Sequence, residues 1–229
     1  MNPIIVALDV ASADMAVSMA TRLAPHVGGF KVGLELLMGE GPDVIRAVGA
    51  LGAPVFADAK LHDIPNTVGN AARQLGRAGA RWVTVHGAGG LAMIEAAVEG
   101  LSEGSGGEAG VLVVTVLTSL DEDGLRETGV GHGLASQVAT LAKLAARAGA
   151  EGVVSSILEV GIVKEAAPSL KVVTPGIRAP DADRDDQRRI GTLTEALDAG
   201  ADLVVVGRAI TGAPDVVAAA RGLADEAGF

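Results

Sequence analysis

The densest cluster of ionisable residues at the end of an apolar run is Asp58-Ala59-Lys60-Leu61-His62-Asp63, which follows Val55-Phe56-Ala57. Residues two apart in an extended chain point to the same face, so Asp58 and Lys60 should project together with the intervening alanine turned away. Lys31 lies in the preceding apolar unit and should come alongside them. Alternating carboxylate and ammonium groups can keep one lysine protonated and another residue poised for proton transfer. A purely structural lattice is disfavoured, because buried ion pairs stabilise a fold less well than apolar packing.

A second group of polar residues suits an anion. Pro175-Gly176-Ile177-Arg178 and Gly207-Arg208 each follow an apolar run, and Gln187 lies between them. Arginine makes bidentate contacts to phosphate oxygens, and backbone N–H groups at a helix N-terminus add to such a site. The charged stretch at 181–189 is either a solvated loop or a lid that carries Gln187 onto the phosphate. These residues together predict a phosphate-binding corner.

The composition disfavours several other classes of protein. The 229 residues include 18 Lys and Arg against 28 Asp and Glu, and the net charge of −10 disfavours a nucleic-acid-binding surface. The absence of cysteine excludes disulfides and thiolate metal sites. No apolar stretch approaches the roughly 18 residues of a transmembrane helix, and the first residues lack the basic segment of a signal peptide. We therefore expect a cytoplasmic enzyme with no membrane or nucleic-acid partner.

The histidines bear on a possible metal site. His26, His62, His86 and His132 are scattered, and only His86 ends an apolar run. A divalent metal would need several His and acidic ligands on facing strands, and no such set is evident. We expect no metal and no cofactor. Packing is the favoured role for His86, although a ligand contact stays open.

Eight short apolar runs rich in β-branched residues must position these groups. Such runs fit strands that are covered on both faces. The predicted strands span residues 4–9, 30–33, 55–58, 82–86, 111–117, 153–155, 172–175 and 203–207. Segments with helical spacing between them include residues 15–23, 44–51, 68–75, 91–98, 134–148 and 216–223.

A weak internal repeat supports this alternation. The segments RAGAR (77–81), RAGAE (147–151) and DAGAD (198–202) each precede a predicted strand, with a glycine where the helix must end. Alternating strands and helices imply a parallel sheet, and about 29 residues per unit matches a βαβ unit. We predict an α/β fold, a (β/α)8 TIM barrel forming one domain over residues 1–229, with an open doubly wound sheet as the alternative.

Active sites of such barrels lie at the carboxyl ends of the strands. Two long loops, 119–131 and 178–191, are expected there, and loops of this length often act as lids. The Gly- and Ser-rich segment 102–110 is expected to be a flexible surface loop on the opposite face. Polar residues end or follow the predicted strands, and they are Asp9, Lys31, Asp58, Lys60, His86, Thr118, Ser155, Arg178 and Arg208.

The stretch Asp58-Ala-Lys60-Leu-His-Asp63-Ile-Pro-Asn-Thr67 resembles the signature of the orotidine 5′-monophosphate decarboxylase family. Related sugar-phosphate decarboxylases share the DxKxxD core, whereas the extension through Thr67 and the lysine at 31 are more specific. Flanking matches occur in the right order along the whole chain. They are Ala7-Leu8-Asp9, Phe30-Lys31-Val32-Gly33, Leu117-Thr118-Ser119, Pro175-Gly176-Ile177-Arg178 and Val206-Gly207-Arg208-Ala209.

The resemblance implies cofactor-free decarboxylation of orotidine monophosphate to uridine monophosphate in pyrimidine biosynthesis. It also implies a homodimer with each active site at the subunit interface. Lys60 would be the proton donor, and Lys31, Asp58 and Asp63 would complete a charged tetrad. Asp63 and Thr67 would reach the partner subunit's site. The other implied substrate contacts are Asp9 and Lys31 for the ribose, Thr118 and Ser119 for the pyrimidine, Arg178, Gln187, Gly207 and Arg208 for the phosphate, and Ile64 and Pro175.

The chemistry agrees with these implied roles. Loss of CO2 from C6 of the pyrimidine leaves a carbanion with no easy electron sink, so a preorganised ammonium group that then donates its proton is the tool required. A carboxylate such as Asp58 would repel the substrate carboxylate until CO2 leaves. Two alternatives stay open. One is a Mg²⁺-dependent sugar-phosphate decarboxylase of the 3-keto-gulonate 6-phosphate type, and the other is a barrel that binds nucleotides without turning them over.

Overall fold

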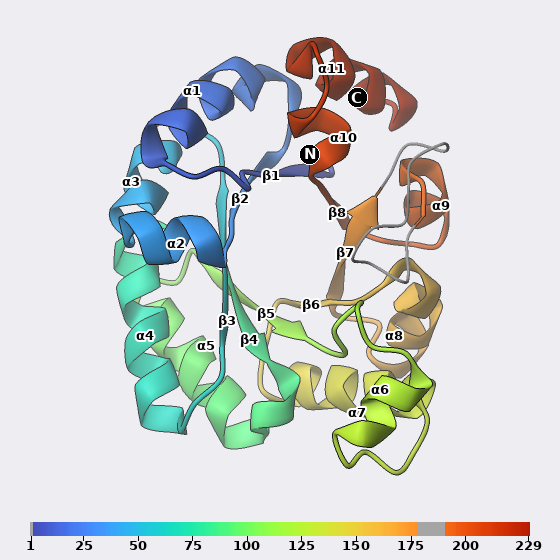
Figure 1. Ribbon diagram of the computed structural model, residues 1–229. Helices are drawn as coiled ribbons and strands as arrows, with labels where there is room; N and C mark the ends of the chain where they lie inside the picture. Colours follow the sequence, from blue (N-terminus) through green and yellow to red (C-terminus); the bar gives the residue numbers. More distant parts are fainter. Residues whose placement is uncertain (1, 178–190) are drawn as a thin grey trace.

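The strands of the protein close into a barrel. The computed structural model describes residues 2–177 and 191–229, with eight parallel strands that pair in chain order and β8 paired to β1 (Figure 1). The predicted (β/α)8 barrel is confirmed, and the open sheet is wrong. The strands are β1 (Ile4–Ala7), β2 (Gly29–Val32), β3 (Val55–Leu61), β4 (Trp82–His86), β5 (Gly110–Val114), β6 (Gly152–Val154), β7 (Lys171–Ile177) and β8 (Leu203–Val206).

Helices surround the barrel on the outside (Figure 1). The α-helices are α1 (Ala13–Leu23), α2 (Leu34–Glu40), α3 (Asp43–Gly49), α4 (Pro65–Arg77), α5 (Leu91–Ser105), α6 (Glu122–Glu127), α7 (Leu134–Arg147), α8 (Val160–Ala166), α9 (Leu193–Asp198), α10 (Arg208–Thr211) and α11 (Val216–Glu226). In the described part of the chain, three 3-10 turns lie at Ala24–His26, Gly87–Gly89 and Ile157–Glu159. Each predicted helical segment overlaps a helix, although 44–51 and 134–148 run past the ends of α3 and α7. None of the helices in the described ranges has both the length and the apolar character needed to cross a bilayer.

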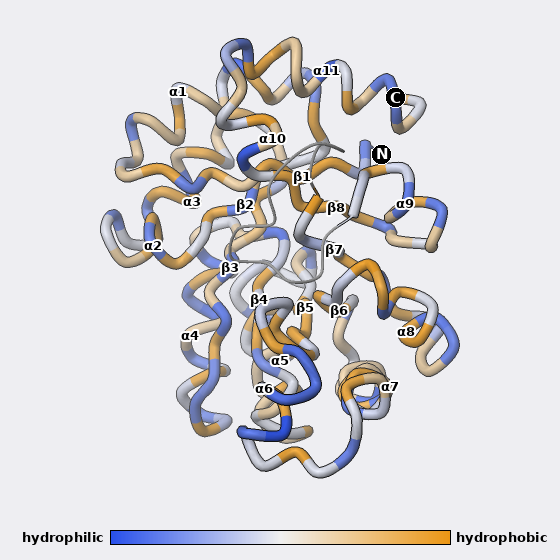
Figure 2. The backbone as a smooth tube through the Cα atoms, turned by 45° about the vertical axis from the view of Figure 1, so that its right-hand side comes forward, coloured by the Kyte–Doolittle hydropathy of each residue, from blue (hydrophilic) through white to orange (hydrophobic). Residues whose placement is uncertain are grey.

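Apolar side chains fill both faces of the sheet. Ile5, Phe56 and Leu112 belong to a buried cluster inside the barrel, whereas Ile4 and Val6 belong to the larger cluster beneath the helices. Neighbouring residues of one strand thus enter different layers, which explains why the strands are continuous apolar runs. In Figure 2 the strand segments are largely apolar, and hydrophilic segments gather on the outer helices and loops.

The repeat identified in the sequence ends the helices as expected. Gly79, Gly149 and Gly200 adopt φ values of 92°, 76° and 98°, a left-handed conformation that costs glycine little. Each of these glycines lies between a helix and the strand that follows.

Two loop predictions were wrong. The segment 102–110 is not a loop throughout, because α5 continues to Ser105 and β5 begins at Gly110. The segment 119–131 contains α6, which begins after Asp121 where the aspartate side chain accepts a hydrogen bond from the Gly124 N–H at 2.9 Å. The charged stretch 181–189 and most of the loop 178–191 lie outside the described residues.

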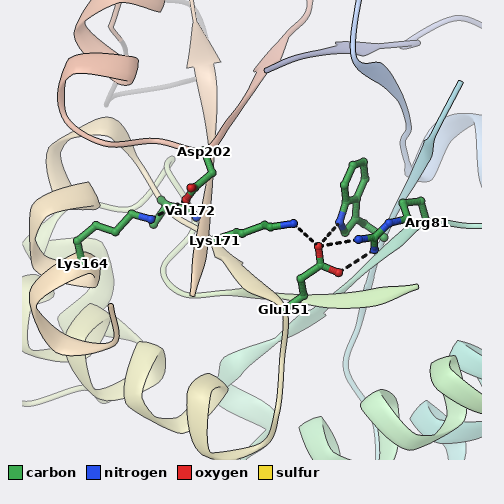
Figure 3. Close-up of polar contacts among 7 residues, drawn as sticks. Arg81, Glu151, Lys164, Lys171, Val172 and Asp202 are labelled. Atoms are coloured by element: carbon green, nitrogen blue, oxygen red, sulfur yellow. Dashed lines mark hydrogen bonds and ion pairs between the residues drawn. The ribbon is translucent and has the colours of Figure 1, made fainter. Parts of the chain in front are cut away.

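A polar cluster lies at the amino ends of the strands, at the other end of the barrel from the predicted site. Figure 3 shows its contacts. Glu151 accepts hydrogen bonds from both terminal nitrogens of Arg81 at 2.7 and 2.9 Å, from Lys171 at 2.8 Å and from the Trp82 indole at 3.1 Å. Beside it, Asp202 accepts from Lys164 at 2.6 Å and from the Val172 N–H at 2.7 Å. These carboxylates tie successive strands together at this end of the barrel.

Candidate active site

A cavity of about 320 Å³ opens at the carboxyl ends of the strands. Its floor is apolar and includes Ala7, Phe56 and Val205 from inside the barrel. Its polar rim comes from β1, β2, β3 and β8 and from the loop after β5. The polar side chains on the rim are Asp9, Lys31, Asp58, Lys60, Thr118 and Arg208. An apolar floor with a few convergent charges is typical of a small-molecule site.

One side of the rim carries a row of ion pairs, which we call the charged network: Asp9, Lys31, Asp58 and Lys60. Lys60 Nζ lies 2.7 Å from Asp58 Oδ2, and Lys31 Nζ lies 3.7 Å from the same oxygen. Lys31 also donates to Asp9 Oδ1 at 3.2 Å. The side chains of Lys31 and Asp58 are each only 13% exposed. The structure therefore brings together three strand ends whose charges alternate in sign.

These neighbours keep Asp58 ionised. Burial alone would raise its pKa, but the ammonium groups of Lys31 and Lys60 and the hydrogen bonds from Lys60 and Thr84 outweigh that effect. The pKa of Asp58 is consequently lowered from its ordinary value. At neutral pH the network contains a carboxylate beside two ammonium groups.

The backbone that brings Asp58 and Lys60 together is not the regular extended strand that the sequence suggested. β3 continues past Asp58 to Leu61, and its register against β4 shifts: Ala57 pairs with Val83, but Leu61 pairs with Val85. Four residue steps on β3 thus match two on β4. Lys60 has a φ of 46° and is the only non-glycine residue in the described ranges with a positive φ. Strain of this kind persists where surrounding contacts hold it, and it is concentrated at functional sites.

Thr84 is a site residue that the sequence reasoning missed. Its hydroxyl donates to Asp58 Oδ1 at 2.9 Å and accepts from the Lys60 N–H at 2.9 Å, and the residue is fully buried on β4. A threonine within the apolar run 82–86 looks like an ordinary strand former. Its position one strand away from the DxK motif, two residues before the polar His86, is the only signal that could have suggested it.

The opposite side of the rim carries part of the predicted phosphate corner. Gly207 and Arg208 line the cavity at the start of α10, and Pro175 and Gly176 line it from β7. Thr118 lines it from the loop after β5. Two further predicted phosphate ligands, Arg178 and Gln187, lie outside the described residues.

The comparisons with known proteins address the whole chain. A family model described as the orotidine 5′-phosphate decarboxylase / HUMPS family matches residues 2–223. The chain belongs to this family. It is 48% identical to a protein of Moorella thermoacetica named orotidine 5′-phosphate decarboxylase, over 98% of this chain and 92% of that protein. It is 44% identical to a protein of the same name from Paramagnetospirillum magneticum, over 100% of this chain and 99% of that protein.

Solved structures agree with this assignment. The crystal structure of orotidine 5′-phosphate decarboxylase from Lactobacillus acidophilus matches with a TM-score of 0.87 and 39% identity, over 99% of both chains. That of the enzyme from Pyrococcus horikoshii matches with a TM-score of 0.80 and 27% identity, again over 99% of both chains. The resemblance first noted in the DxKxxD motif thus extends through the whole barrel.

Some residues of the family signature do not line the cavity of this chain. Asp63, Ile64 and Thr67 are exposed at the start of α4, with Ile64 66% accessible, and Ser119 is likewise absent from the described lining. Asp63 Oδ1 accepts a hydrogen bond from the Ile64 N–H at 2.6 Å. One subunit therefore presents these family residues outward.

His86 and Ser155, two of the polar strand ends, are also outside the described lining. The His86 ring lies 5.5 Å from the His62 ring, centroid to centroid. Burial, together with the charges of His62 and Lys60, lowers the pKa of His86 against the opposing effect of Asp58, which favours a neutral packing histidine. Ser155 is buried and donates to Glu159 at 2.9 Å. Within the described ranges, no group of three or more His, Asp or Glu side chains is placed to hold a metal ion.

Proposed function

We propose that this member of the family decarboxylates orotidine 5′-monophosphate to uridine 5′-monophosphate, with the charged network as its catalytic centre. The observation that carries the proposal is the position of Lys60, whose ammonium group lines the cavity while bonded to the ionised Asp58 at 2.7 Å. The names of the relatives support the same reaction. As a carboxy-lyase of this kind, the protein acts in pyrimidine biosynthesis.

The reaction needs one bond cleavage and one proton transfer. The bond between C6 of the pyrimidine and the carboxylate carbon breaks, CO2 leaves, and the electron pair stays on C6. Lys60 then donates a proton from Nζ to C6, and the neutral amine regains a proton from water. An ammonium group already fixed beside the developing negative charge lowers the barrier before and during this transfer.

Asp58 and Lys31 prepare Lys60 for this role. The Asp58 carboxylate directs the Lys60 ammonium group and, when the substrate binds, lies near the substrate carboxylate. Repulsion between the two carboxylates is relieved as neutral CO2 forms, which favours the transition state over the bound substrate. Lys31, whose Nζ lies 3.7 Å from Asp58 Oδ2, offsets the second negative charge that the substrate carboxylate brings. We assign the contacts with the ribose hydroxyls to Asp9 and Lys31.

The phosphate end of the substrate is assigned to the other side of the rim. Gly207 and Arg208 at the start of α10 supply a backbone N–H and a guanidinium group, to which the signature adds Arg178 and Gln187. Thr118, Ser119 and Pro175 are assigned to the pyrimidine side. Binding energy gathered at the phosphate, away from C6, can be used to orient the reacting ring.

We further propose that the working unit is a homodimer. Asp63, Ile64 and Thr67 then complete the partner subunit's site rather than their own. Support comes from the exposed apolar side chains at the same end of the barrel: Leu34 and Met38 on α2 are 44% and 78% exposed, and Ile64 is 66% exposed. These residues follow β2 and β3, which are neighbours in the barrel.

The proposed activity is tested by following the loss of orotate absorbance with and without EDTA. We expect turnover of orotidine monophosphate at the same rate in both. If folded protein instead acts only on 3-keto-gulonate 6-phosphate and only with Mg²⁺, the sugar-phosphate decarboxylase is the right assignment. If it binds uridine monophosphate and forms no product from any of these substrates, the protein is a nucleotide-binding barrel and the proposal is wrong.

A further inference from the structure

We infer that Thr84 is a positioning residue for the decarboxylation, because its hydroxyl group holds both the backbone of Lys60 and the carboxylate of Asp58 in place. This inference rests on the function proposed above. Thr84 is not itself among the residues that line the cavity, and it acts through Asp58 and Lys60, which are.

The direction of both hydrogen bonds is fixed by chemistry. The Lys60 N–H can only donate, so the Thr84 oxygen must accept from it at 2.9 Å. The single hydroxyl proton is then directed to Asp58 Oδ1, also at 2.9 Å. Since Thr84 is fully buried, water cannot easily replace either contact. The hydroxyl therefore has one available orientation, and it serves both partners at once.

The shift in register between β3 and β4 explains why a side chain is needed here. Ala57 and Leu61 pair with Val83 and Val85, so the extra residues of β3 between them cannot all find backbone partners on β4. The Lys60 N–H lies in this irregular stretch and points at β4, where it meets the Thr84 hydroxyl in place of a carbonyl group. A buried N–H without a partner is costly, so this bond stabilises the positive φ of Lys60.

The same hydroxyl determines which Asp58 oxygen accepts from which donor. Oδ1 accepts the neutral hydroxyl of Thr84, which leaves Oδ2 for the ammonium groups of Lys60 at 2.7 Å and Lys31 at 3.7 Å. Rotation of the carboxylate would exchange these roles and move Lys60 Nζ away from its position. An error of about 1 Å at a reacting group can cost about 100-fold in rate, so a support of this kind matters for turnover.

The test compares Thr84→Val, which keeps the shape and removes the hydroxyl, with Thr84→Ser, which keeps the hydroxyl. Thr174→Val is the matched control. Thr174 is equally buried on a strand of the same barrel, and its hydroxyl has no hydrogen-bond partner among the described residues. The measurements are kcat, KM, the affinity for uridine monophosphate, and the pH profile of kcat/KM.

We expect Thr84→Val to lower kcat about 10- to 100-fold while the affinity for uridine monophosphate changes less than about 3-fold. Thr84→Ser should recover kcat to within about 5-fold of the parent protein, and Thr174→Val should match the parent.

The acid limb of the pH profile provides a readout that a merely structural role would not move. Asp58 is faced by Lys31 on β2, Lys60 on β3, and Thr84 and His86 on β4, with Asp9 beyond Lys31. Loss of the Thr84 donor raises the pKa of Asp58, so its carboxylate takes up a proton at a higher pH. The acid limb of Thr84→Val should therefore move to higher pH, and that of Thr84→Ser should stay in place.

Three outcomes would overturn the inference: a Thr84→Val protein with the parent's kcat and acid limb, a loss of activity that Thr84→Ser shares in full, or an equal loss in Thr174→Val. If Thr84→Val does not fold, Thr84→Ala is compared with Thr84→Ser by the same criteria. Failure of the parent protein to decarboxylate orotidine monophosphate would instead reject the proposed function, so the two failures are distinguishable.

Discussion

Charged side chains line a cavity at one end of the barrel and stabilise the fold at the other. At the carboxyl ends of the strands, charges surround a cavity. At the amino ends, Glu151 accepts hydrogen bonds from Arg81, Trp82 and Lys171. Burial would raise the pKa of Glu151, but these hydrogen bonds and the charge of Arg81 lower it from 4.5 to about 2. Glu151 therefore stabilises the fold in its ionised form.

This low pKa predicts a pH-dependent contribution to stability. The contribution is fully present above the ordinary pKa of a glutamate and is lost as the pH falls from about 4.5 towards 2. We expect Glu151→Gln to lower the free energy of unfolding by about 1–3 kcal/mol at pH 7 in urea titrations, and by much less near pH 2.5. Glu99→Gln, on the exposed face of α5, serves as the control. A deficit that is equal at both pH values would contradict this role.

The charged residues of the site could be predicted from the sequence, but the contacts that hold them in place could not. Asp58, Lys60 and Lys31 are polar interruptions at the ends of apolar runs, so their types and spacing indicated a site. The positive φ of Lys60 and the hydroxyl of Thr84 depend on how β3 meets β4, and no local pattern encodes that register. The roles of Asp9, Arg208 and the other proposed contacts stay predictions.

Among the elements, α4 and α5 come unusually close. A Cβ atom on Gly100 would lie 2.0 Å from the Gly69 carbonyl oxygen, and one on Gly104 would lie 2.2 Å from that of Arg73. Glycine is thus required where the two helix backbones touch. Because α4 begins at Pro65, directly after Asp63 and Ile64, this contact also fixes the residues that we assign to the partner subunit's site.

Glycine substitutions test this close contact. We expect Gly100→Ala to lower the free energy of unfolding by about 1–3 kcal/mol, since the added methyl group meets backbone that cannot move aside. Gly222→Ala is the matched control, because a Cβ at this exposed position of α11 meets nothing within 4 Å. That change should be neutral or stabilise by up to about 1 kcal/mol. Equal effects of the two substitutions in thermal or urea unfolding would show that the helices do not need the glycine.

The same packing explains an error in the predicted elements. The last turn of α5 contains Ser102, Gly104 and Ser105, a composition typical of a loop. Gly104 is needed at this position because the backbone of α4 leaves no room for a Cβ atom. This tertiary contact outweighs the low helix propensity of glycine. Strong periodicity identified the longer helices, whereas short α6 depends on one capping residue, Asp121.

Eight nearly equal units in the sequence predicted a closed sheet, and the barrel is closed. Closure of the barrel does not determine the number of subunits. In our proposal the exposed family residues Asp63 and Thr67 act only across an interface, so a second subunit is needed. Each active site of the dimer would take Lys60 from one chain and Asp63 from the other.

Mixing two inactive variants tests this sharing. In a hybrid of Lys60→Ala and Asp63→Ala subunits, one site keeps both native residues and the other loses both. Refolding the two together should restore about a quarter of the parent activity, since random pairing makes about half of the dimers hybrids. Each variant refolded alone is the control. Two inactive variants that stay inactive after mixing, while forming dimers, would place Asp63 and Lys60 of the same chain in one site.

We assign the proton that reaches C6 to the Lys60 ammonium group. The measurement that tests this assignment is decarboxylation by Lys60→Ala in single turnovers, with the enzyme saturating and in excess over orotidine monophosphate, and with uridine monophosphate binding measured on the same samples. We expect the rate to fall at least about 10⁴-fold with a folded barrel and retained nucleotide binding, whereas Lys143→Ala on the outer face of α7 should leave the rate unchanged. A Lys60→Ala protein that keeps a rate within about 10-fold of the parent would show that the proton comes from another group.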